Sequence, residues 1–249
     1  MPFGAEVPRK IGDPRHRAAG RRGSGTRGMT DIMETDSGDR YRLLAPLYDG
    51  LTAPFLWSVR SNIRRIVQEC GYHTVLDVCC GTGRMAMMLH GSGFSVSAVD
   101  LSPSMLARAR RNSPPGIRYF LEDAARLHFQ TASFDCAIIS FALHEMNPSK
   151  RMHVLAETSR VTRKGGAIIV ADYIRPRGML ANGFQAVVNV VERIAGKDHH
   201  ANYVTFVREG GLEPLAAGLG MKLTVRRRTF MDNAALMVIE ANGNPRTLI

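Results

Sequence analysis

The stretch VLDVCCGTGRMA, residues 75–86, joins a strand pattern to a helix pattern through a loop that contains two glycines. Its first four residues, VLDV, are typical of a buried strand because they are mostly apolar and partly β-branched. Gly81 and Gly83 then allow the backbone to approach a ligand closely where the next helix begins. Ligands of open parallel sheets bind beyond the carboxyl ends of the strands. The stretch therefore predicts an α/β fold with a ligand loop after its first strand.

Strand and helix patterns alternate around this stretch, with short connections. Helices are expected at residues 38–49, 54–70, 84–93, 102–112, 147–166, 180–195 and 203–219. Strands are expected at residues 74–79, 94–100, 117–123, 134–143 and 166–174, then at 221–230 and 233–241, which Met231-Asp232 joins. Alternation is typical of a parallel sheet with helices on both faces, and two successive strands indicate a hairpin. We therefore predict a doubly wound sheet of seven strands, mostly parallel, with a C-terminal antiparallel hairpin.

The basic charge is concentrated at the N-terminus. The chain has 249 residues and a net charge of +11, of which residues 1–28 carry +5. This segment is rich in glycine, proline and arginine, and it cannot bury enough apolar surface to offset the entropy lost on ordering. We expect a disordered basic tail at residues 1–36 and one domain at 37–249. A basic tail also leaves open an alternative function, nucleic-acid binding or RNA modification, which we do not favour.

The cysteines and the hydropathy indicate the cellular compartment of the protein. No segment is long and apolar enough for a secretory signal or a membrane-spanning helix. The cysteines are Cys70, Cys79, Cys80 and Cys136, and their spacing is not that of a zinc site or a disulfide framework. We therefore expect reduced thiols, no metal, no transmembrane segment and a cytoplasmic protein.

Two aspartates discriminate between the cofactors that the loop could bind. Gly81, Gly83 and Ala86 satisfy the pattern GxGxxA, which is compatible with a nicotinamide dinucleotide. However, Asp77 ends the first strand, where its carboxylate would repel a pyrophosphate but suits a cofactor with a cationic amino-acid end. Asp100 ends the second strand, where a carboxylate can accept both ribose hydroxyls. Together they favour S-adenosyl-L-methionine.

Five motifs, in order, resemble those of the class I S-adenosylmethionine-dependent methyltransferases. They are LDVCCGTG (76–83), VDLSPSML (99–106), LEDAARLHF (121–129), FDCAIISFALHEM (134–146) and RVTRKGGAIIVADYI (160–174). Within that family, DVCCGTG and APLYDG are most similar to the quinone-biosynthesis C-methyltransferases and their relatives. The resemblance implies a Rossmann-like fold with S-adenosylmethionine as cofactor.

The resemblance also implies which residues bind that cofactor. The methionine end is held by the first motif, with Asp77, Gly81, Thr82 and Gly83 in contact and Cys79 packed behind the loop. The adenosine is held by the next two motifs, through Asp100, Leu101, Met105, Asp123 and Ala124. Phe141 would lie along the cofactor, and Tyr48 could cap it.

Methyl transfer from a sulfonium requires alignment and exclusion of water, and it requires a base only where the acceptor is protonated. His144, just after the fourth strand, is the candidate base, with an unperturbed pKa that suits neutral pH. Glu145 and Tyr203 are candidate substrate contacts. A lid is expected at residues 176–206, in which His199 is more readily explained as part of a solvated loop.

The residues after the fourth strand limit the acceptor. SFALHEM (140–146) lacks the Asn/Asp-Pro-Pro-aromatic sequence that enzymes methylating the amino groups of nucleobases normally carry there. His144-Glu145 stands where quinone methyltransferases usually carry an Arg-Asn pair. The acceptor is therefore expected to be a small and hydrophobic organic molecule, with quinol, phenol, lipid-like and thiol acceptors left open.

Overall fold

The computed structural model describes most of the chain from residue 45 onward. The described residues are 45–177, 181, 183, 185, 186, 188, 189, 192, 193, 196–230 and 232–241, with the backbone alone at 45–55. The predicted tail at 1–36 and the predicted domain start at 37 lie outside these residues, as does Met231 of the predicted hairpin turn.

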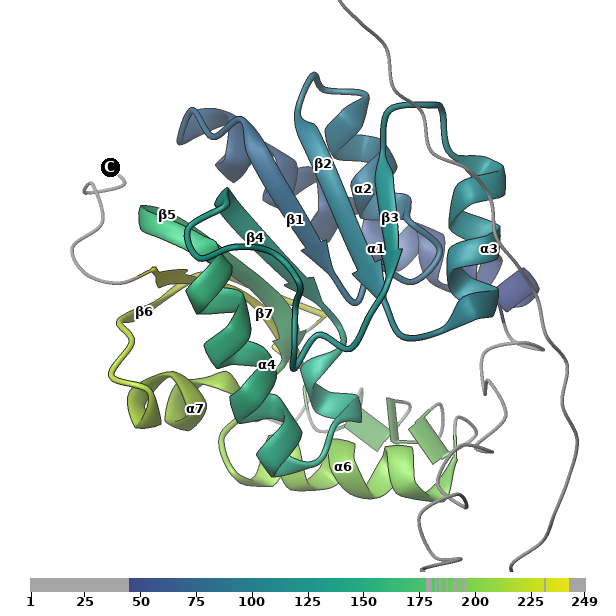
Figure 1. Ribbon diagram of the computed structural model, residues 1–249. Coiled ribbons are helices and arrows are strands. Elements are labelled where there is room, and N and C mark those ends of the chain that lie inside the picture. The colour runs from purple at the N-terminus through teal and green to yellow at the C-terminus, as the bar shows by residue number, and fades with distance from the viewer. Residues whose placement is uncertain are drawn as a thin grey trace, which may run out of the picture. The chain divides into compact units, whose positions relative to one another are not determined.

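Seven strands form one sheet in the described part of the chain, in the order β3-β2-β1-β4-β5-β7-β6 (Figure 1). Every neighbouring pair is parallel except the two that involve β7. The strands are β1 (Thr74–Val78), β2 (Ser95–Asp100), β3 (Arg118–Leu121), β4 (Phe134–Ser140), β5 (Thr162–Tyr173), β6 (Leu223–Thr229) and β7 (Ala234–Glu240). The predicted doubly wound sheet and its C-terminal hairpin are confirmed.

Helices cover both faces of this sheet (Figure 1). They are α1 (Ala45–Glu69), α2 (Arg84–His90), α3 (Pro103–Asn112), α4 (Pro148–Val161), α6 (Lys197–Arg208), α7 (Leu212–Gly218) and the 3₁₀ turn η1 (Leu143–Glu145). The described residues between 181 and 193 are also helical. No helix in these ranges is long and apolar enough to cross a membrane.

The core consists of two apolar layers, because successive side chains of a strand point to opposite faces. In β4, Ala137 and Ile139 pack toward α4, α6 and α7. Cys136 and Ile138 pack toward α1 and α2 on the other face. All four side chains are fully buried, so both faces of the sheet exclude water around β4, and this strand reads as a continuous apolar run.

Besides the start of α6, at Lys197 instead of 203, and the end of β4, at Ser140 instead of 143, three predicted boundaries are wrong. The helices predicted at 38–49 and 54–70 are one continuous helix from Ala45, although Pro54 lies within it. A proline inside a helix costs about 3 kcal/mol, and the apolar stripe of α1 that is buried on the sheet offsets this cost. The helix predicted at 203–219 is two helices, because Gly210 and Gly211 have φ values of 101° and 71°, which no helix contains.

The third wrong boundary lies between α4 and β5. The helix predicted at 147–166 ends at Val161, and the strand begins at once. Phe134 pairs with Thr162, whereas Cys136 pairs with Ala167. The residues between Thr162 and Ala167 therefore form a bulge in β5 rather than a last helical turn.

Candidate functional site

The carboxyl ends of β1 and β4, which are neighbours in the sheet, both turn through a strained residue. Cys79 follows β1 with φ 57°, and Phe141 follows β4 with φ 51°. A non-glycine residue in this region costs of order 1 kcal/mol or more, and such residues cluster at functional sites. The Phe141 N–H donates to the carbonyl of Ala171 at 2.7 Å, which holds the turn in place. The backbone thus leaves the sheet sharply at the edge where the ligand is expected.

Asp100 organises the loop after β1. One of its carboxylate oxygens accepts a hydrogen bond from Gly81 N–H at 2.7 Å, and the other accepts one from Ser102 N–H at 2.9 Å. The same side chain therefore joins the glycine loop to the start of α3. A carboxylate oxygen can accept more than one hydrogen bond, so a hydroxyl could share these oxygens with the backbone.

The two glycines of the loop have different roles. Gly81 has φ 54°, and a Cβ placed on it would meet no atom within 4 Å. Gly83 has φ 75°, and a Cβ there would lie 2.3 Å from the hydroxyl of Tyr119. Gly83 is therefore required by packing against β3, whereas Gly81 faces open space above the sheet.

Asp77 is buried beneath the loop and is 1% exposed. Its Oδ2 has no hydrogen-bond partner among the described residues. Burial raises the pKa of this carboxyl to about 7, and the negative charge of Asp100 adds to the effect, although the Ala86 N–H and Arg60 act against it. An orphaned carboxylate oxygen in this position fits a cationic ligand group.

The residues predicted to hold the adenosine lie on the β2 and β3 side of the loop. Leu101 is 59% exposed, and Ala124 and Met105 are buried. Asp123 accepts hydrogen bonds from Ala125 N–H and Lys150 Nζ, both at 3.0 Å. Burial raises the pKa of Asp123, but these bonds outweigh burial and lower it. Exposed Leu101 and the anchored carboxylate of Asp123 fit a flat ligand with polar edges.

The remaining predicted cofactor residues are less informative. Thr82 is 3% exposed, so it supports the loop from within. Burial raises the pKa of the Cys79 thiol well above its ordinary value, which makes it inert as a nucleophile. Tyr48 belongs to α1, at a position where the structure describes the backbone alone.

His144 is buried at the end of β4 and pairs with an aspartate that the sequence analysis missed. Its Nδ1 lies 2.7 Å from Asp172 Oδ1, at the end of β5. Burial lowers the pKa of His144, but Asp172, with smaller contributions from Glu145 and Glu192, outweighs burial and raises the pKa to about 9. The expectation of an unperturbed imidazole is therefore wrong.

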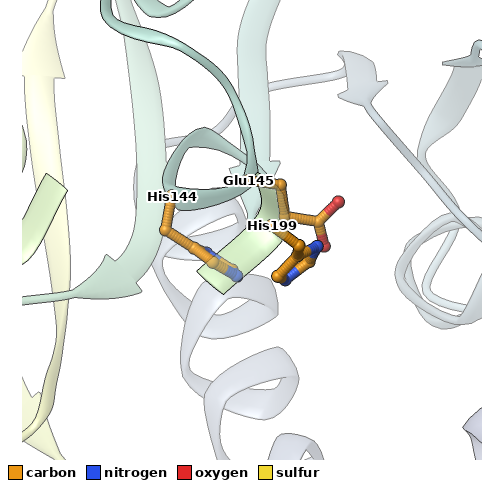
Figure 2. A group of neighbouring side chains, drawn as sticks. All are labelled: His144, Glu145 and His199. Carbon is orange, nitrogen blue, oxygen red and sulfur yellow. The ribbon is translucent and has the colours of Figure 1, made fainter. Parts of the chain in front are cut away.

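Two further polar side chains reach His144 from the segment after β5. Glu192 Oε2 lies 3.8 Å from His144 Nε2 and 2.5 Å from His199 Nε2. Glu192 also accepts a hydrogen bond from the hydroxyl of Tyr173 at 3.1 Å. His199 thus lies in α6 beside the end of β4, not in a solvated loop as expected (Figure 2). Tyr203, a predicted substrate contact, is 2% exposed and packs its ring against Tyr173.

The segment α6 is fastened to η1 by a buried arginine. Arg151 is 1% exposed, and it donates to the carbonyl of Leu143 at 3.0 Å and to the carbonyl of Asn202 at 2.6 Å. Asn202 in turn donates to the carbonyl of Glu145 at 2.8 Å. These bonds cross between the two segments, so they hold α6 against the end of β4.

Part of the chain matches a known protein family. Residues 75–166 match the family described as methyltransferase domain. An uncharacterised methyltransferase from Synechocystis sp. is 38% identical over 106 residues, which are 43% of this chain and 50% of that protein. A demethylmenaquinone methyltransferase from Renibacterium salmoninarum is 40% identical over 137 residues, which are 53% of this chain and 56% of that protein. The chain spans about half the length of these curated relatives.

A solved structure extends the comparison to more of the chain. An O-methyltransferase family protein from Burkholderia thailandensis matches with a TM-score of 0.62 and 13% identity, over 79% of this chain and 59% of that one. At this identity the likeness concerns the fold alone. The family match at 75–166 includes the glycine loop, Asp77, Asp100 and His144.

Proposed function

Since the chain carries a class I S-adenosylmethionine-dependent methyltransferase domain, we propose that it methylates a small organic acceptor of the hydroquinone or phenol class. The observation that carries the proposal is the loop after β1. Gly81 leaves room above the sheet, Asp100 lies at its edge, and Asp77 offers a buried oxygen that has no hydrogen-bond partner in the described part of the chain. These features fit three parts of the cofactor: its methionine chain at Gly81, its ribose hydroxyls at Asp100 and its ammonium group at Asp77.

The cofactor supplies a methyl group that its sulfonium already activates. The protein must therefore hold cofactor and acceptor in line and keep water out. Asp100 is anchored by two backbone N–H groups, so it is preorganised to receive ribose hydroxyls. Asp77 in its ionised form attracts the ammonium, and Leu101 covers an apolar face.

We propose that His144 contacts the acceptor. Its bond to Asp172 orients the ring, and its Nε2 lies 3.8 Å from Glu192 Oε2, beyond hydrogen-bond distance, so Nε2 can donate to an acceptor. Because Asp172 favours the charged imidazole, His144 would donate a hydrogen bond to the oxygen of an acceptor that has lost its proton to water, and it would stabilise that anion. An ionised phenol is a better nucleophile than the neutral phenol, whether the methyl group goes to oxygen or to ring carbon.

The acceptor class is supported by the relatives. Several of them, from different bacteria, are named demethylmenaquinone methyltransferase. A naphthohydroquinone carries an ionisable hydroxyl, which matches a hydrogen-bond donor at His144. We propose that residues 37–249 form the enzyme domain, with 176–206 as a lid over the acceptor.

The thiols support the cytoplasmic location that we propose. The four cysteines are free. Burial raises the pKa of Cys80 and Cys136 well above the ordinary value, so they are poor nucleophiles at neutral pH. Reduced, unreactive thiols are typical of proteins in a reducing compartment.

A matched pair of glycine variants tests cofactor binding. Gly81 and Gly71 both have positive φ, 54° and 64°, and open space around a new Cβ, but Gly71 follows α1, away from the loop. Both alanine variants should lose about 1 kcal/mol of stability through left-handed strain. In calorimetry with S-adenosylhomocysteine, Gly81→Ala should lose binding and Gly71→Ala should keep it. Equal binding by both variants would contradict the cofactor site.

An acceptor screen tests the reaction. The protein should release S-adenosylhomocysteine when given reduced naphthoquinones or phenols together with S-adenosylmethionine. His144→Ala should lower turnover by roughly 10²–10³-fold, as for removal of an oxyanion donor. Turnover of thiols alone, with no reaction of any phenol or quinol, would reject the acceptor class while leaving the cofactor site intact.

A further inference from the structure

Three side chains that could ligate a metal ion converge beyond the carboxyl end of β4. His144 and Glu145 come from η1, and His199 comes from α6 (Figure 2). Each offers one ligand atom, and these atoms all lie within 4.8 Å of one another. The ligands of a zinc ion lie roughly 3–3.5 Å apart at bond lengths of about 2.0–2.2 Å, so small side-chain rotations would close the set. Glu145 and His199 are partly buried, and His199 would have to exchange its contact with Glu192 for the ion.

His144 already has the outer-shell partner that metal-bound histidines usually have. Its Nδ1 lies 2.7 Å from the buried carboxylate of Asp172. A carboxylate at Nδ1 fixes the ring and its tautomer and makes the other nitrogen a better ligand. Nε2 of His144 is therefore the atom that remains for an ion.

The two segments are held together independently of any ion. Asn202 in α6 donates to the carbonyl of Glu145, and Arg151 bridges the carbonyls of Leu143 and Asn202. The ligands are thus 54 residues apart in the sequence but are presented on one rigid support. A support of this kind lowers the entropy lost when an ion binds.

The charge around the cluster is negative. Glu192 Oε2 lies 3.8 Å from His144 Nε2 and 2.5 Å from His199 Nε2, and Asp172 lies on the far side of the His144 ring. Three carboxylates around two imidazoles would attract a divalent cation, which would displace any proton from the two ring nitrogens that bind it. The alternative is that these groups only form hydrogen bonds with one another and bind no ion.

We propose that His144, Glu145 and His199 bind one divalent first-row transition-metal ion. Two imidazoles and a carboxylate suit zinc, cobalt, iron or manganese, whereas calcium and magnesium prefer oxygen ligands alone. Three protein ligands leave a coordination position open, as in catalytic sites. The site does not depend on methyl transfer. Nε2 of His144 cannot bind an ion and donate a hydrogen bond at the same time, so in the metal-bound protein the ion, rather than the imidazole, would supply the positive charge beside an acceptor oxygen.

Direct metal binding tests this proposal. The full-length protein is dialysed against a chelator and titrated with zinc in a calorimeter, then with cobalt while visible absorption is followed. We expect one ion per chain and cobalt bands that indicate nitrogen ligands. The variants are His199→Ala and Glu145→Gln, with His200→Ala as the matched control, since His200 is the next residue of α6 and faces Asn189.

His199→Ala and Glu145→Gln should weaken zinc binding at least roughly 10–100-fold, as much as loss of an outer-shell partner does, and His200→Ala should not. Circular dichroism of each variant checks the fold. Zinc affinity that is unchanged in His199→Ala, or the absence of a saturable site in the wild-type chain, would overturn the proposal. Calorimetry with S-adenosylhomocysteine on the same samples reports on the proposed function separately.

Discussion

Replacing Asp77 by asparagine should change how the stability of the protein depends on pH. Burial raises the pKa of Asp77 in the folded protein to about 7, from an ordinary value of 3.8. The folded state therefore holds this proton more tightly than the unfolded state does. The contribution is fully present below about pH 4 and is lost as pH rises toward 7. At about 1.4 kcal/mol per pKa unit, the loss is about 4 kcal/mol.

Urea denaturation of the ligand-free protein at half-unit steps from pH 4 to 8 measures this effect. The free energy of unfolding of Asp77→Asn, minus that of wild type, should rise by about 1.4 kcal/mol per pH unit between pH 4 and 7 and then level off. Taking the difference removes the contribution of every other titrating group. A difference that stays flat over this range would refute the reasoning, because Asp77 would then be ionised at its ordinary pKa.

Asp135→Asn is a control of opposite sign. Burial raises the pKa of Asp135, but hydrogen bonds from the N–H groups of Thr74 and His73 and from Arg163 outweigh burial and lower it to about 2. Asp135 contributes stability that is present above about pH 4 and lost below it. The difference between this variant and wild type should therefore be flat from pH 5 to 8, where the Asp77 difference changes.

Two substitutions test the packing around the site. Gly83→Ala should destabilise the protein by about 2–4 kcal/mol, because its Cβ would meet the hydroxyl of Tyr119 at 2.3 Å in a left-handed backbone. In thermal melts Tyr119→Phe should restore part of that loss, and a double variant no better than Gly83→Ala would count against the steric cause. Arg151→Leu should cost about 2–4 kcal/mol, since it removes two charge-assisted hydrogen bonds, to the carbonyls of Leu143 and Asn202. A urea midpoint equal to that of wild type would show that this clamp contributes nothing.

The sequence by itself determined the fold class and the cofactor loop. The apolar strands, the glycines at 81 and 83 and the strand-end aspartates are local patterns, and hydrophobic periodicity depends on neighbours within a few turns. The roles of individual residues there, such as Asp77 and Asp100, stay proposals that the calorimetry tests. Helix propensity gave a wrong prediction at Pro54, where it indicated a break. The buried apolar side chains of α1 keep the helix continuous there.

Only the tertiary structure decided what surrounds His144. Asp172 and Glu192 carry no motif of their own, although an aspartate at the end of an apolar strand is a signal that could have been followed. His199 reads locally as part of a polar loop, yet it lies in α6 beside His144 and Glu145 (Figure 2). These residues are brought together by the connections between strands and by the hydrogen bonds of Arg151. Contacts between residues so far apart produce no hydrophobic periodicity in the sequence, so the sequence could not predict them.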